Sequence, residues 1–159
     1  MARNTAPFTA TYGRDKGKKF IIKEMSAFGL EEWSLRALLA IMRNNPGMPD
    51  GFEAMGAAGM VQVGLRALQQ LQWVEAQPLL AQMMDCVSVV PDSGRPNFTR
   101  PLNTEEDDIE ELKTIEDLRA EWWTLHMGFF MAALPSLVSR AKDAIAAKTP
   151  RLNTQTQPS

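Results

Sequence analysis

The chain has 159 residues, of which 45% are hydrophobic, so it can bury one compact core of ordinary composition. Its 17 basic and 19 acidic residues leave a formal net charge of -2, which disfavours a nucleic-acid-binding protein because such proteins usually carry a clear basic excess. A single cysteine excludes an internal disulfide. No apolar run has the length of a signal peptide or a membrane span, so we expect a soluble, intracellular protein that does not span a membrane.

The N-terminal residues predict a β-hairpin. Residues 8–12 alternate large and small side chains, residues 13–17 contain two glycines and an aspartate typical of a turn, and residues 19–23 favour β-structure. Six basic side chains against two acidic ones make this arm locally basic. A solvated edge strand protected by lysines explains that charge, and a contact with an acidic partner protein is the alternative.

Three amphipathic segments follow, and each is predicted to form a helix. The first covers residues 27–44, where apolar side chains recur at helical spacing. The second covers residues 52–71. Three glycines interrupt it, so we expect it either to pack tightly against a neighbouring backbone or to be locally mobile. The third runs from Trp73 to between Asp85 and Val87.

A strand, a loop and a long helix are predicted in the second half. Residues 87–90 favour a short strand, and residues 91–102, with three prolines and one glycine, favour a loop. A helix capped near Thr104 then opens with six acidic residues in the seven positions 105–111. Capping explains three or four of these acids, so we expect the rest to form a charged outer face. Pro135 is expected to break or bend this helix before a short helical ending.

The expected fold class is therefore mainly α with a small N-terminal β-hairpin, a compact helical domain with one long C-terminal helix. We expect a basic arm and hairpin over residues 1–24, a helical domain over residues 25–148, and a disordered polar tail over residues 149–159.

The residue types argue against catalysis. One histidine and one cysteine are too few ligands for a metal centre, and the acids of residues 105–111 lack the spacing of a calcium loop. No dinucleotide or phosphate-binding pattern occurs. Cys86 and His126 are the one thiol and imidazole pair available to a nucleophilic enzyme, and neither has a local motif. We expect no enzyme, no metal and no cofactor.

Bulky apolar side chains favour a protein-binding function instead. Ten methionines supply flexible contacts of the kind found in grooves that accept varied helices, and gap filling in a small core is the alternative for each one. Adjacent residues on a helix diverge by about 100°, so one of two neighbouring tryptophans is a candidate contact residue. The expected partner-binding residues are Trp122, Trp123, Phe129, Phe130, Met83 and Met84.

The order of three segments resembles a known family. Residues 19–27 lead into the first predicted helix, residues 71–87 form the third, and residues 108–112 run on to residues 125–130. Over about residues 18–131, this pattern is similar to the tail assembly chaperones of long-tailed bacteriophages.

The resemblance implies a mainly helical, non-enzymatic protein of the host bacterial cytoplasm that is absent from the finished virion. Such proteins coat the long helical tape measure protein, keep it soluble and help to recruit tail tube subunits. The expected partners are therefore the tape measure protein and the tail tube protein, with no nucleic acid and no membrane, and with self-association in multiple copies left open. The alternatives are a structural virion component, such as a tail terminator or head-tail joining protein, and a thiol enzyme using Cys86 and His126.

Overall fold

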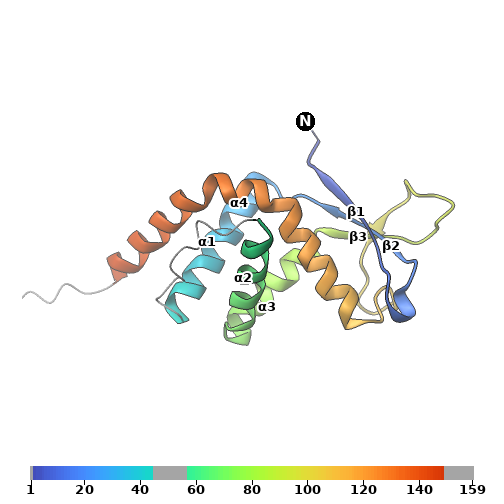
Figure 1. The fold of residues 1–159 in the computed structure, drawn as a ribbon, viewed down its shortest axis with the longest axis horizontal. Helices are drawn as coiled ribbons and strands as arrows, with labels where there is room; N and C mark the ends of the chain where they lie inside the picture. The colour runs from blue at the N-terminus through green and yellow to red at the C-terminus, as the bar shows by residue number, and fades with distance from the viewer. Residues whose placement is uncertain (1, 45–56, 149–159) are drawn as a thin grey trace, which may run out of the picture.

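The computed structural model describes residues 2–44 and 57–148, which form one sheet and five helices, one of them a 3-10 helix. The elements follow in the order β1 (Thr5–Thr9), η1 (Gly13–Asp15), β2 (Lys19–Lys23), α1 (Ala27–Asn44), α2 (Ala57–Gln69), α3 (Trp73–Met84), β3 (Val87–Val90), β4 (Arg100–Pro101) and α4 (Leu112–Lys148). Figure 1 shows the strands gathered at one end of the molecule and helices α1, α2 and α3 on one side of α4.

This architecture corrects the expected fold class. The sheet has four strands in the order β1-β2-β3-β4, all antiparallel, and not a small hairpin alone. The helical part of the described chain is divided among five helices, so it is not one long C-terminal helix with a hairpin attached. The prediction is wrong because β2 pairs with β3 across three intervening helices, and local sequence patterns do not reveal such a distant pairing.

The sheet buries one face against the helices. Phe20 lies opposite Val89 and Ile22 lies opposite Val87, and all four side chains are buried. The predicted hairpin is present as β1 and β2, joined through η1. Gly13 has a φ angle of 56°, a conformation that side chains disfavour, so the glycine suits this turn.

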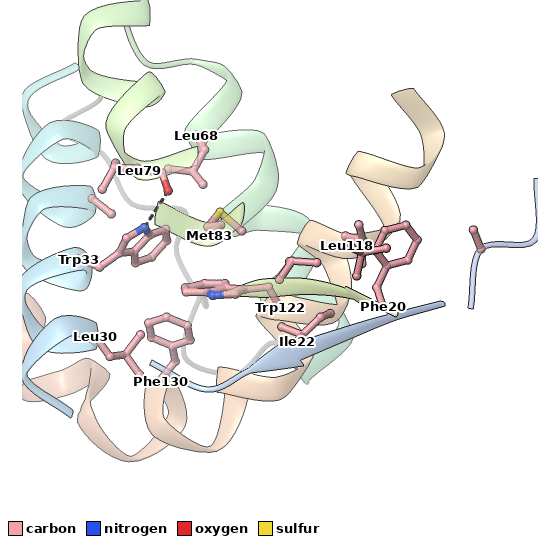
Figure 2. Close-up of a cluster of buried hydrophobic side chains, with 14 residues drawn as sticks. Phe20, Ile22, Leu30, Trp33, Leu68, Leu79, Met83, Leu118, Trp122 and Phe130 are labelled. Carbon is pink, nitrogen blue, oxygen red and sulfur yellow. Dashed lines mark hydrogen bonds between the residues drawn. The ribbon is translucent and has the colours of Figure 1, made fainter. Parts of the chain in front are cut away.

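The core lies where β2, α1, α3 and α4 meet, as Figure 2 shows. The rings of Trp33 from α1 and Trp122 from α4 have their centroids 4.7 Å apart, and Phe130 lies 6.2 Å from each. The indole Nε1 of Trp33 donates a 3.0 Å hydrogen bond to the carbonyl oxygen of Leu79 on α3. This bond satisfies the buried donor and ties α1 to α3.

Helix α2 contributes a close contact to this core at Gly64. A Cβ atom at this position would lie 2.8 Å from two ring atoms of Trp123, so only glycine allows this approach of α2 to α4. The tight packing expected of the glycine-containing helix is found at this point. Residues 52–56 of that predicted helix, and the predicted disordered tail of residues 149–159, lie outside the described residues.

The acidic segment does not open a helix. Helix α4 begins at Leu112, whereas residues 104–111 form turns and extended chain, so the expected acidic first turns are a misassignment. The Arg100 guanidinium donates two hydrogen bonds of 2.7 Å to the Asp108 carboxylate, which in turn accepts a 2.9 Å bond from the Asn103 N–H. A charge-assisted pair with this fork geometry holds the segment in its turn.

Asp15 joins this acidic segment to the hairpin. Its fully buried carboxylate accepts hydrogen bonds from the backbone N–H groups of Glu110 and Glu111 at 3.0 and 2.9 Å, and from the Lys18 ammonium at 2.8 Å. Burial would raise the pKa of Asp15, but the hydrogen bonds from Lys18 and from these N–H groups outweigh burial and lower the pKa to about 2. The carboxylate thus fixes the backbone just before α4.

Helix α4 continues through Pro135, where the sequence predicted a break or a bend, and Figure 1 shows that the helix is curved. Its second half packs on α1 through a small cluster in which Leu38 contacts Leu137 and Ala141. An ion pair between Arg140 and Glu31 joins the same two helices.

Candidate functional site

Three of the six predicted partner-binding residues are core residues. Trp122 and Met83 are fully buried, and Phe130 is 5% exposed. Figure 2 shows Trp122 between Met83 of α3 and Ile22 of β2. Because these side chains are enclosed by α1, α3 and the sheet, they present no surface to a partner in this conformation.

Two further predicted residues, Trp123 and Phe129, are half-buried at the edge of the core. The Trp123 ring lies 5.5 Å from that of Trp33 and 5.0 Å from that of Phe130, and its indole Nε1 is buried without an acceptor among the described residues. The Phe129 ring stands edge-on to Phe130 at 5.7 Å. Both side chains therefore make most of their contacts within the chain.

The sixth predicted residue, Met84, lies in an open groove between α3 and α4. The groove has a volume of about 520 Å³. Its second wall is the first half of α4, and the segment from Pro101 to Ile109 also lines it. The apolar side chains that line it are Trp73, Leu80 and Met84 from α3, Leu102 and Ile109 from the connecting segment, and Ile115 from α4.

Helix α3 forms one wall of the groove because it is apolar on two faces. Leu79 and Met83, four residues apart, point into the core. Trp73, Leu80 and Met84, spaced by seven and four residues, form a second stripe along the groove. Trp73 is 70% exposed, whereas Leu80 and Met84 are half-buried and also pack against the edge of the core. A monomeric helix needs only one apolar stripe for its core, so a second stripe that lines a groove is typical of a binding surface.

Two of the four charged side chains that line the groove are held in ion pairs, whereas Asp85 and Arg119 form none within the described residues. Asp108 and Glu106 both pair with Arg100, at 2.7 and 3.0 Å. Arg119 of α4 forms no ion pair within the described chain, and its Nε atom is buried without a hydrogen-bond partner there. Burial lowers the pKa of Arg119, partly opposed by the charge of Glu116, but a guanidinium stays protonated in any case.

The thiol and imidazole of the enzyme alternative are both engaged in packing. His126 is buried, its Nδ1 lies 2.7 Å from the Trp122 carbonyl oxygen, and the Met25 N–H donates to its Nε2 at 3.0 Å. This arrangement requires a neutral ring with the proton on Nδ1, since Nε2 is the acceptor. The Trp122 indole donates to the Cys86 sulfur at 3.4 Å, and burial raises the pKa of the Cys86 thiol. Neither group is placed as a nucleophile or a base.

The buried His126 predicts a pH dependence of stability. Burial lowers the pKa of His126, so below about pH 6.5 the unfolded chain binds a proton that the folded chain does not. The free energy of unfolding should therefore fall on acidification, by at most about 1.4 kcal/mol between pH 7.5 and pH 5.5, the limit for one proton. Urea unfolding at pH 7.5 and at pH 5.5 measures this change in the free energy of unfolding. Because the chain has one histidine, His126→Gln is a direct control that should lose this slope, and a wild-type protein equally stable at both values would contradict the prediction.

Sequence reasoning missed Trp73, Leu80 and Arg119 as site residues. The spacing of the second α3 stripe was present in the sequence, but spacing alone does not show which of two apolar stripes a neighbouring element covers. No sequence pattern shows that Arg119 is unpaired, because this depends on the ion pairs that Arg100 forms with Glu106 and Asp108.

The geometry thus defines a small α+β protein with an apolar groove that carries one unpaired cation. Comparison with protein-family models, with curated proteins and with solved structures finds no match to the chain. Among the described residues, no helix combines the length and apolar character needed to cross a membrane.

Proposed function

We propose that this chain is a phage tail assembly chaperone, which binds apolar helical segments of the tape measure protein in the groove between α3 and α4. In this role it keeps the tape measure protein soluble in the host bacterial cytoplasm and helps to recruit tail tube subunits. The observation that carries the proposal is the second apolar stripe of α3, with Trp73 exposed and Leu80 and Met84 half-buried, which forms one wall of a groove of about 520 Å³. The resemblance over about residues 18–131 supplies the identity of the partner.

The size of the groove supports a helical guest. The stripe from Trp73 to Met84 extends over 11 residue steps, or about 16 Å along α3, which matches three turns of a partner helix. Helices that bind in grooves place apolar anchors at every third or fourth position, and the α3 wall offers three large apolar side chains, Trp73, Leu80 and Met84, over the same length. Many copies of such a modest contact, repeated along a long helical chain, would cover its apolar surface.

Co-purification with tape measure fragments tests this proposal. Leu80→Glu places a charge in the centre of the apolar wall, so we expect it to weaken binding by at least about tenfold and to remove the fragment from the purified complex. Phe28→Glu is the matched control, because Phe28 is 85% exposed on α1 and lies outside the groove. Circular dichroism should show unchanged helical content in both variants. Equal recovery of the fragment with wild type and Leu80→Glu would refute the groove as the binding site.

The sheet edge gives no support to the alternative of a ring-forming virion component. At the two ends of β1, the N–H of Ala10 donates to the Lys18 carbonyl and the Asn4 carbonyl accepts from the Glu24 N–H, so the backbone groups of even-numbered residues face β2. Pro7 therefore faces the free edge, where its missing N–H weakens pairing with another strand. Detection of this chain by mass spectrometry in purified mature particles would favour the virion component over the chaperone.

A further inference from the structure

We infer that the groove selects amphipathic helices that carry a carboxylate within their apolar face, and that this carboxylate pairs with Arg119. The inference deepens the proposed function and rests on it for the identity of the natural partner. The groove chemistry itself is defined by Arg119 and the apolar side chains around it.

The state of Arg119 is the first step of the argument. A guanidinium carries five N–H donors in a fixed plane and needs acceptors for them. In the described chain the Nε of Arg119 is buried and makes no hydrogen bond, and no carboxylate lies within ion-pair distance of its nitrogen atoms. The Arg119 side chain lines the groove and its charge is not neutralised by an ion pair, so a partner carboxylate that reaches its Nη groups gains affinity. A carboxylate matches the guanidinium fork in both charge and geometry.

The acids of the groove do not satisfy this need. Glu106 and Asp108 line the groove but are held by Arg100, at 3.0 and 2.7 Å. Asp85 also lines the groove and forms no ion pair with Arg119. Glu116 precedes Arg119 by one turn on α4 and attracts it only from beyond ion-pair distance. An incoming carboxylate is therefore the group that would complete the site.

The position of Arg119 also sets the position of the carboxylate on the guest. Ile115 and Arg119 are four residues apart on α4 and line the same groove, so they follow one another along its wall. A guest helix that places an apolar residue against Ile115 would bring an acidic residue three or four positions away to Arg119. A guest with lysine at that position would bury two like charges together, which provides selection against such segments.

Three synthetic helical peptides of about 20 residues provide the test. They share one apolar face and differ at a single position within it, which is glutamate, glutamine or lysine. With wild-type protein, fluorescence anisotropy should show that the glutamate peptide binds about tenfold more tightly than the glutamine peptide, and that the lysine peptide binds most weakly. Arg119→Gln should abolish the preference, and Arg119→Glu should reverse it in favour of lysine. Arg66→Gln, which removes an exposed charge on α2, should leave the preference intact.

The outcomes separate this inference from the proposed function. Equal binding of the three peptides, no binding of the glutamate peptide, or an unchanged preference in Arg119→Gln would overturn the inference even if tape measure fragments still bind. A preference that follows the charge at position 119 would support the inference even if tape measure fragments fail to bind, in which case the proposed function falls alone. A concentration-dependent dimer that Arg119→Glu dissociates would assign the groove to a second copy of the chain and overturn the inference.

Discussion

Replacement of Trp122 by alanine is expected to lower the free energy of unfolding by about 4 kcal/mol, the effect of removing a large aromatic side chain from a packed core. The Trp122 ring is fully buried and lies 4.7 Å from Trp33, 5.6 Å from Trp123 and 4.2 Å from His126. Its indole also donates to the Cys86 sulfur. The substitution therefore removes a side chain that packs against α1, α3 and the sheet. Urea unfolding followed by circular dichroism measures the loss.

Trp73→Ala is the matched control for this prediction. It makes the same chemical change on α3, where the side chain is 70% exposed, so its effect on the free energy of unfolding should be within about 0.5 kcal/mol. The two variants thus test whether the fold depends on the Trp122 side chain and not on the exposed Trp73 side chain. Similar destabilisation by both substitutions would show that the distinction between core and groove is incorrect.

The parts of the fold that could be predicted from the sequence are those determined by local chemistry. Residues 27–44 carry a helical apolar pattern, with Ser26 before it as a capping residue and Pro46 shortly after it as a stop signal, and α1 occupies Ala27–Asn44. Glycines at both ends of the turn of residues 13–17 marked the hairpin, because a turn there needs backbone conformations that side chains disfavour. In each case the information lies within a few residues of the element that it determines.

The acidic segment was misassigned because distant groups decide its structure. Six acids in seven positions fit the first turns of a helix by the dipole argument, and nothing in the segment itself contradicts that interpretation. In the structure, Asp15 binds the backbone N–H groups of Glu110 and Glu111, and Arg100 binds Asp108. These contacts fix a turn, and α4 begins only at Leu112.

The candidate site, too, depends partly on local sequence and partly on distant contacts. The sequence indicated that residues 122–130 form an apolar helix face, which is true, but it could not show that Trp33 of α1 covers that face. Exposure depends on which helix packs on which stripe, and that is a property of the tertiary structure. The open stripe is instead on α3, where Met84 is the one predicted contact residue that lines the groove.

Asp15→Asn is expected to lower the free energy of unfolding at neutral pH by about 2 kcal/mol. A carboxyl whose pKa falls from 3.8 to about 2 on folding stabilises the folded state by roughly this amount once it is ionised. The side chain is fully buried, so solvent does not screen its bonds to Lys18 and to the backbone before α4. Asparagine keeps the shape but loses the charge that strengthens these bonds.

The pH dependence identifies the cause of this effect. Because the folded-state pKa of Asp15 is lowered, its contribution is present above the unfolded pKa of 3.8 and disappears as the pH falls towards 2. The pKa of Asp108 is lowered too, but Asp15 is not among its causes, so this contribution cancels in the difference between wild type and Asp15→Asn. The negative charge of Asp15 raises the pKa of Glu111, so the titration of Glu111 contributes to that difference. Asp92→Asn, at an exposed loop position, should change stability by less than about 0.5 kcal/mol. A difference between wild type and Asp15→Asn that stays constant from pH 6 to pH 2 would mean that packing, and not the buried carboxylate, joins the hairpin to α4.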